Sequence, residues 1–286
     1  MNSRTLHMKR ASRMVLLIYV LGACCAASGT ENPFIVLQST TSTQNSGLFD
    51  YLLPMYEKLT GIAVRSVAVG TGQALRNARQ GDADVLLVHA KSAEEEFIAE
   101  GYGVRRFDLM YNDFVIIGPS LDPAKVRGES DVLAALRKIA HAKAIFASRG
   151  DDSGTHKKER SLWSAIDVDV DAVSGTWYRE TGSGMGTTLN IATGIDGYVM
   201  SDRATWISFK NKRDHEILVS GDKRLFNQYG IILVNPQRHP KVKSEEGQAF
   251  IDWLLGSEGQ RAIAEFRIEG KQLFYPNVKS THSLDN

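Results

Sequence analysis

Cysteine is nearly absent from this sequence of 286 residues, and both copies, Cys24 and Cys25, lie close to its start. A mature chain cleaved after them would contain no thiol, which excludes disulfides and cysteine-ligated metal sites. The seven histidines are scattered, and Asp151 and Asp152 lack the continuation of a calcium-binding EF-hand loop. We therefore expect no metal site and no cofactor.

A strong excess of either charge is also missing. The chain has 34 basic and 33 acidic side chains, and the first 28 residues hold four of the basic ones and no acid. The remainder is slightly acidic, whereas a nucleic-acid-binding protein usually carries a basic patch. Nucleic acid is therefore not an expected partner. The sequence contains no repeat or long linker, and its length suits one large or two modest domains.

A short apolar stretch, MVLLIYVLGACCAAS, follows the basic start and falls short of the ~20 residues of a membrane span. A basic segment, a short apolar run and small residues are typical of a secretory signal, here residues 1–28. The sequence LGAC at 21–24 also resembles a bacterial lipobox, in which Cys24 would be lipidated. Ordinary cleavage near Ala27 or Ser28 is the alternative. Either way, we predict export to the periplasm.

Apolar runs alternate with amphipathic stretches through the rest of the chain. The runs predict strands at residues 34–40, 63–70, 83–89, 114–119, 144–148 and 229–235. A helix is expected at 46–61, with a kink at Pro54. Two further helices are expected to start at capping boxes, formed by Ser92 with Glu95 and by Ser257 with Gln260. This alternation predicts an α/β protein with parallel sheets.

Three of the expected strands run directly into polar corners that begin helices, at 40–43, 70–73 and 148–155. A hydroxyl at such a corner caps the helix, while the free N–H groups of the first turn carry positive partial charge. Simple capping explains any one corner. Three corners, one of them with Arg149, favour convergent anion binding at the carboxyl edge of a sheet.

A fourth corner, TGSGMGTTLNIA at 181–192, contains glycines that allow close backbone approach to a ligand. The geometry of these corners adds Thr71 to the predicted binding residues, together with Gly184, Met185 and Arg203. For Arg203, a surface ion pair with Asp202 is the alternative.

Nucleotide binding and catalysis lack their usual motifs. The glycine-rich stretches have neither the dinucleotide fingerprint nor the Gly-Lys-Ser/Thr ending of a phosphate loop. Ser153 has Asp151 two residues before it, where a hydrolase nucleophile elbow requires glycine. We therefore expect no enzymatic activity. A hydrolase that uses Ser153 and His156 is the alternative from a different class.

Several long motifs carry a family resemblance. STTSTQNSGLFDYLLP, VAVGTGQAL, GDADVLLVHA, SRGDDSGTHKKE, WYRETGSGMGTTLNIA and FNQYGIILVNP occur in that order between about Phe34 and Pro276. Together they resemble the periplasmic tungstate-binding proteins of bacterial tungstate ABC importers. The family's usual Thr-Thr-Thr-Ser run appears here as Ser-Thr-Thr-Ser at 39–42.

The resemblance implies a two-lobed α/β periplasmic-binding-protein fold of type II. Each lobe would be a mixed sheet flanked by helices, with the ligand in the interlobe cleft. Lobe one would combine 34–113 with 236–286, and lobe two would be 114–235. The chain would cross between lobes near 111–114 and 234–236.

The resemblance also implies the ligand and the residues that hold it. The ligand would be tungstate or molybdate, delivered by a monomeric binding protein to an ABC permease in the inner membrane. The residues carried over are Thr40, Thr41, Ser42, Arg149, Ser153 and Thr155. Phosphate is the alternative ligand, because Asp151 or Asp152 could accept the proton of hydrogen phosphate. These carboxylates could instead orient Arg149 or cap the helix.

Overall fold

The computed structural model describes residues 33–278, so the predicted signal segment and Cys24 lie outside the described residues. The strands are β1 (Phe34–Thr40), β2 (Ala63–Val69), β3 (Val85–Val88), β4 (Gly103–Pro119), β5 (Phe146–Ser148), β6 (Tyr178–Glu180), β7 (Tyr198–Asp202), β8 (His215–Val219), β9 (Phe226–Val234), β10 (Arg267–Ile268), β11 (Lys271–Gln272) and β12 (Tyr275–Pro276). The α-helices are α1 (Thr41–Asn45), α2 (Leu48–Thr60), α3 (Thr71–Gln80), α4 (Lys91–Ala99), α5 (Val132–Ala142), α6 (Gly154–Ser164), α7 (Val170–Val173), α8 (Met185–Gly194), α9 (Arg203–Ser208), α10 (Ser244–Leu255) and α11 (Ser257–Glu265), and a 3-10 turn, η1, covers Lys223–Leu225.

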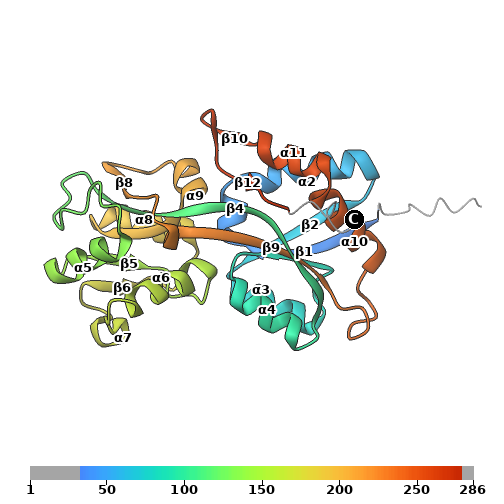
Figure 1. Ribbon diagram of the computed structural model, residues 1–286, viewed down its shortest axis with the longest axis horizontal. Helices are drawn as coiled ribbons and strands as arrows, with labels where there is room; N and C mark the ends of the chain where they lie inside the picture. Colours follow the sequence, from blue (N-terminus) through green and yellow to red (C-terminus); the bar gives the residue numbers. More distant parts are fainter. Residues whose placement is uncertain (1–32, 279–286) are drawn as a thin grey trace, which may run out of the picture. The chain divides into compact units, whose positions relative to one another are not determined.

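The main sheet runs in the order β2-β1-β3-β9-β4-β7-β5-β6, with β8 and β12 also paired to β4 (Figure 1). Its flanks are parallel, since β1 runs parallel to β2 and β3, and β5 to β6 and β7. The long strands β4 and β9 are antiparallel to their neighbours. The sheet is therefore mixed, as the family resemblance implied, and the chain has the two-lobed α/β fold.

The strand β4 belongs to both lobes. It pairs with β9 as far as Asp113 and with β7 from Phe114 onward. The family resemblance predicts the second crossing near 234–236. Strand β9 pairs with β3 and β4 over Phe226–Val234. We therefore propose that lobe two ends near Leu225, because a strand paired throughout with lobe-one strands belongs to that lobe.

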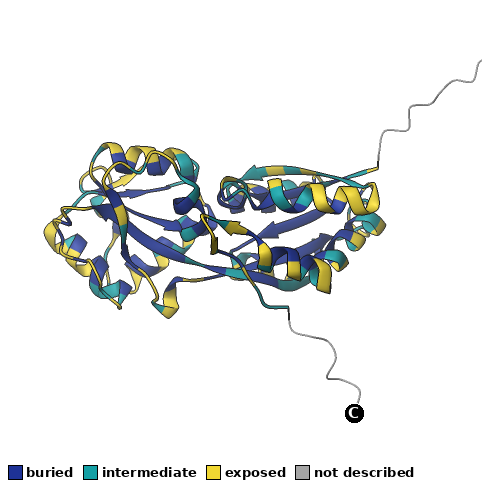
Figure 2. Ribbon diagram, turned by 90° about the horizontal axis from the view of Figure 1, so that it is seen from above, coloured by how far each residue is buried: buried dark blue, intermediate teal, exposed yellow. Residues whose placement is uncertain are grey.

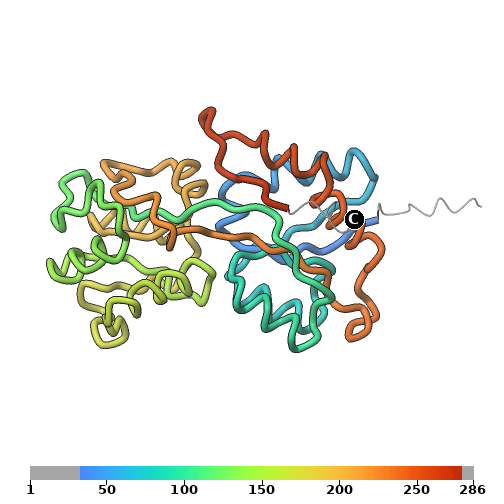
Figure 3. The backbone as a smooth tube through the Cα atoms, in the orientation of Figure 1, coloured from blue at the N-terminus to red at the C-terminus, as the bar shows by residue number. Residues whose placement is uncertain are grey.

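The C-terminal helices pack against the first strand and the second helix of the described chain. The C-terminal helices α10 and α11 (red) lie against β1 and α2 (blue), as the backbone tube of Figure 3 shows. We propose on this basis that the C-terminal segment 236–286 belongs to lobe one. Within residues 33–278, no helix has both the length and the apolar character that a membrane crossing requires.

The core lies on both faces of the sheet. The strands are largely buried, and the helices expose one face each (Figure 2). In lobe two, Trp163 is fully buried and packs edge-on against Phe146, with ring centroids 5.1 Å apart. Burial of these large apolar surfaces supplies the main driving force for folding.

Each expected strand has a counterpart, and α2 continues through Pro54. The first part of β4 was not predicted from the sequence, because the charged residues Arg105 and Arg106 interrupt the apolar pattern of a strand. Both predicted capping boxes are wrong: α4 starts one residue before Ser92, and Ser257 is already inside α11. At α4 the Glu94 side chain instead accepts from the Ala90 N–H at 2.6 Å.

Candidate functional site: a cluster of hydroxyls around Arg149

The four polar corners predicted from the sequence each begin a helix. The N-cap residues are Thr40 for α1, Gly70 for α3, Ser153 for α6 and Gly184 for α8. Ser153 accepts from the His156 N–H at 3.2 Å, whereas Gly70 and Gly184 offer no side-chain cap. The first turns of α3 and α8 therefore keep donors that a bound anion could use.

Close backbone approach joins α3 to the loop before α6. The Gly154 N–H donates to Thr71 Oγ1 at 3.0 Å, and the Gly72 N–H donates to the Asp152 carbonyl at 3.3 Å. A β-carbon on Gly72 would lie 1.9 Å from Asp152 Oδ2 and 3.3 Å from the Asp152 carbonyl oxygen, so a side chain at Gly72 would displace the Asp152 side chain and crowd the loop. The corners at 70–73 and 148–155, far apart in the sequence, thus form one surface.

Arg149 links this surface to α1. Its guanidinium donates to Ser42 Oγ at 3.2 Å and to Thr41 Oγ1 at 3.1 Å, and it pairs with Asp151 Oδ2 at 2.5 Å. Burial lowers the pKa of Arg149, and the carboxylates of Asp151 and Asp202 oppose that shift. An arginine keeps its charge at any physiological pH. The structure therefore holds a fixed, buried cation, 1% exposed, between two neutral hydroxyls and the carboxylate of Asp151.

Two buried polar atoms in this cluster have no hydrogen-bond partner in the described chain, Arg149 Nε and Thr155 Oγ1. A buried donor without a partner is costly, and native proteins usually satisfy it with water or a ligand. Gly184, at the start of α8, lies close by: a β-carbon there would be 3.6 Å from Thr41 Oγ1. The arrangement offers several converging donors around one positive charge, which suits a small oxyanion.

The structure gives Thr40 and Met185 other contacts. Thr40 Oγ1 accepts from the Thr43 N–H at 3.3 Å and lies 2.8 Å from Thr43 Oγ1, so this hydroxyl caps α1. The Met185 side chain is fully buried in the hydrophobic core, so that only its backbone N–H, in the first turn of α8, could donate to an anion. Of the predicted residues, the cluster brings together Thr41, Ser42, Thr71, Arg149, Ser153 and Gly184, and Thr155 follows on α6 as a buried residue.

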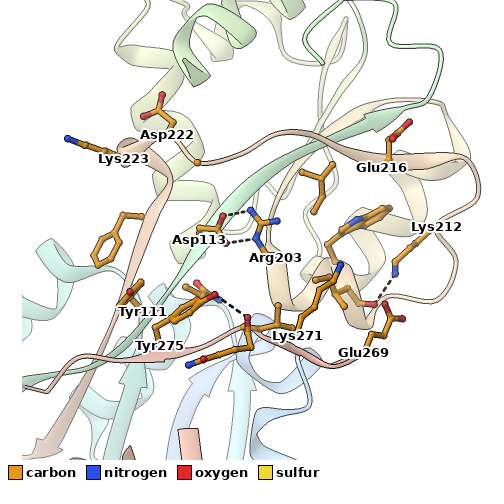
Figure 4. Close-up of a pocket in the computed structure, with 18 of the residues that line it drawn as sticks. Tyr111, Asp113, Arg203, Lys212, Glu216, Asp222, Lys223, Glu269, Lys271 and Tyr275 are labelled. Carbon is orange, nitrogen blue, oxygen red and sulfur yellow. Dashed lines mark hydrogen bonds and ion pairs between the residues drawn. The ribbon is translucent and has the colours of Figure 1, made fainter. Parts of the chain in front are cut away.

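Arg203 lies elsewhere, which corrects our prediction. Its guanidinium forms a two-pronged ion pair with Asp113, with Nε–Oδ1 and Nη2–Oδ2 distances of 2.8 and 2.5 Å (Figure 4). The alternative pairing with Asp202 is also wrong, because the Asp202 carboxylate caps α9. Arg203 lines an open cavity of about 1020 Å³ that it shares with Lys212, Lys271 and Tyr275.

Two buried titratable groups near Arg149, Asp202 and His89, were not predicted from the sequence. Burial raises the pKa of Asp202 to about 6; its Oδ1 accepts from the Thr205 N–H at 2.9 Å, and Oδ2 has no partner in the described chain. Burial, with a smaller contribution from Arg149, lowers the pKa of His89 to about 4. Asp202 ends β7 at a strand-to-helix corner, the same signal that identified the other corners.

The structure does not pair Ser153 with His156 as a nucleophile and base. Ser153 Oγ accepts from the backbone N–H of His156, while the ring Nδ1 of His156 accepts from the Asp152 N–H at 3.2 Å. The other ring nitrogen lies 3.9 Å from Glu180 Oε1. A serine hydrolase requires the imidazole to accept the serine proton, and neither ring nitrogen is placed to do so.

Comparison with known proteins assigns the chain to a family. The family model described as a PBP superfamily domain matches residues 26–258. The tungstate-binding protein TupA of Peptoclostridium acidaminophilum is 45% identical over 277 residues, which cover 93% of this chain and 96% of that protein.

Solved structures agree with this placement. The tungstate-binding protein TupA from Desulfovibrio alaskensis G20 is 48% identical, with a TM-score of 0.74, and the match covers 86% of this chain and 100% of that one. The tungstate ABC transporter structure from Geobacter sulfurreducens is 45% identical, with a TM-score of 0.75, and the match covers 82% of this chain and 98% of that one. The chain therefore belongs to the PBP superfamily and, within it, to the family of periplasmic tungstate-binding proteins.

Proposed function

We propose that this chain captures tungstate at the cluster around Arg149 and delivers it to an ABC permease for import. The observation that carries the proposal is the buried Arg149 guanidinium, held between the hydroxyls of Thr41 and Ser42 and the carboxylate of Asp151. Relatives at 45–48% identity that are named for tungstate support the choice of ion. Molybdate, a tetrahedral dianion of nearly the same size, is expected to bind as well.

The donors are sufficient for tight binding. A charge-assisted hydrogen bond contributes roughly 1.5–3 kcal/mol, and nanomolar affinity requires about 12 kcal/mol. The guanidinium, the hydroxyls and the uncapped first turns of α3 and α8 together supply enough donors, provided that water is excluded. Most of these hydroxyls are fully buried, which fits that condition.

The carboxylates of the 148–155 corner favour an oxyanion that carries no proton. Asp151 is engaged by Arg149 and by the Ser153 N–H at 3.2 Å. Asp152 is engaged by Lys157 and lies 3.6 Å from Arg76. Hydrogen phosphate would need a free acceptor for its proton, and tungstate at neutral pH would not. Asp202 Oδ2 is still without a partner, so phosphate is the alternative that the experiment must separate.

Several further statements belong to the same proposal. We expect the chain to be exported by the segment 1–28, to act in the periplasm as a monomer, and to require neither a cofactor nor catalytic turnover. Lipidation at Cys24 is the alternative to cleavage near Ala27. Cys24→Ala would release a lipidated protein from the membrane fraction and would leave an already soluble one unchanged.

Calorimetric titration of the purified protein with tungstate, molybdate, sulfate and phosphate tests the ligand. We expect tungstate and molybdate to bind with 1:1 stoichiometry and at least a hundredfold more tightly than the other two ions. If phosphate binds more tightly than tungstate, phosphate is the ligand. No binding of any of the four would refute an oxyanion site.

A further inference from the structure

A second group of potential ligands lies in lobe two, outside the cluster of Thr41, Ser42, Thr71, Arg149 and Ser153 at which we propose that the oxyanion binds (the oxyanion cluster). Asp196 is in the turn between α8 and β7, Asp214 precedes β8, and His215 is the first residue of β8. One ligand atom from each of these three side chains lies within 4.8 Å of the others. Asp196 precedes Asp214 by 18 positions and His215 by 19, and the fold brings the three side chains together.

The His215 ring is prepared for an additional bond. The residue is only 5% exposed, and its buried Nδ1 has no hydrogen-bond partner in the described chain. The other nitrogen, Nε2–H, donates to the Gly197 carbonyl at 3.2 Å, which leaves the lone pair on Nδ1. Metal-binding histidines are commonly oriented by such a hydrogen bond from the opposite ring nitrogen.

The distance between His215 Nδ1 and Asp214 Oδ1 is 3.4 Å. A charged hydrogen bond would be shorter, about 2.7–2.9 Å. Two ligands of a tetrahedral ion, each about 2.0–2.1 Å from the metal, lie about 3.3 Å apart. A hydrogen bond also orients the Asp214 carboxylate, because its Oδ2 accepts from Ser120 Oγ at 3.2 Å. The separation therefore suits two ligands of one ion better than a direct hydrogen bond.

We propose that Asp196, Asp214 and His215 bind one zinc ion, with water in the fourth position. Two carboxylates and a neutral imidazole balance the charge of a divalent cation. Calcium and magnesium prefer oxygen ligands only, whereas zinc accepts a mixed set of nitrogen and oxygen. Asp196 and Asp214 are exposed, so an ion and its water can enter from solvent. The bound ion would fasten the turn after α8 to the start of β8.

The test is calorimetry and thermal unfolding of the full chain, purified without a polyhistidine tag, freed of metal with EDTA and kept free of tungstate. We expect one zinc per chain, and a rise in Tm of about 5 °C or more when zinc is present at about a hundredfold excess over Kd. Cobalt, as a spectroscopic probe, should give the intense visible bands of tetrahedral coordination.

The exposed variants Asp196→Asn and Asp214→Asn keep the side-chain size and should fold, and each should weaken zinc binding at least tenfold. His215→Ala should abolish the cobalt bands. Asp167→Asn is the matched control for Asp196, since both aspartates are exposed and have positive φ, 58° and 50°; it should bind zinc like wild type. The absence of stoichiometric zinc binding in wild type, or unchanged affinity in Asp196→Asn and Asp214→Asn, would overturn the proposal.

Discussion

Removal of the Arg149 guanidinium should damage binding more than any other single change in the oxyanion cluster. The side chain donates to Thr41, Ser42 and Asp151, and its two terminal nitrogens are the only fixed cationic donors among these corner residues. Loss of two charge-assisted hydrogen bonds to the anion would cost about 3–6 kcal/mol, a decrease in affinity of a hundredfold or more. Most of this loss should appear as faster release of the ion.

The assay is calorimetric titration of tungstate and molybdate into wild type, Arg149→Ala and Arg149→Lys. Lysine should recover only part of the affinity, because a single ammonium group cannot replace a two-pronged donor. Arg160→Ala is the matched control: Arg160 lies on α6 and forms an exposed two-pronged pair with Asp171. Folding is monitored by circular dichroism, since Asp151 loses its partner in Arg149→Ala. Affinities within a factor of two across the series would refute the placement of the site.

The remaining predictions concern neighbouring residues and the buried acid of lobe two. Ser42→Ala should weaken tungstate binding by about 1–3 kcal/mol with little change in Tm, whereas Thr40→Ala, which removes a cap, should lower the free energy of unfolding by about 1 kcal/mol with a smaller effect on affinity. The reverse ranking in calorimetry and thermal melts would show that Thr40 is the ligand. Gly72→Ala should weaken binding and lower Tm, because its β-carbon would meet Asp152 Oδ2, and an unchanged protein would show that α3 and the 148–155 loop move freely. Burial raises the pKa of Glu159 to about 7, against hydrogen bonds from Tyr178, Ser148 and Trp163 that lower it. Because the folded pKa lies above the unfolded value, the wild type should lose up to about 3 kcal/mol as pH rises from about 4.5 to 7. The neutral variant Glu159→Gln should escape that loss, so its Tm relative to wild type should increase between pH 5 and pH 8. A constant difference in Tm between the two proteins would contradict the buried-acid account.

Local sequence patterns predicted much of the oxyanion cluster. A strand followed by hydroxyl or glycine residues and a helix start is a short-range signal, and it placed Thr41, Ser42, Thr71 and Arg149 at one edge of the sheet. The sequence leaves the role of Asp151 open between orienting Arg149 and capping the helix, and in the structure Asp151 makes both contacts, with Arg149 at 2.5 Å and with the Ser153 N–H at 3.2 Å.

Long-range pairing could not be predicted in the same way. Arg203 and Asp113 are 90 residues apart, and nothing in the SDRATW stretch identifies its partner. The antiparallel pairing of β9 with β3 and β4 likewise depends on tertiary contacts. The apolar sequence of β9 predicts a buried strand but does not indicate the lobe to which that strand belongs. Thr40 and Ser42 both offer a hydroxyl at the same corner, and only the backbone geometry at the start of α1 makes Thr40 the cap.

The most direct test is anomalous X-ray scattering from crystals grown with tungstate, recorded at a tungsten absorption edge. We expect one strong peak within hydrogen-bond distance of the Arg149 guanidinium and of the Thr41 and Ser42 hydroxyls. A peak in the cavity beside Arg203 and Lys271, with none at Arg149, would contradict the account.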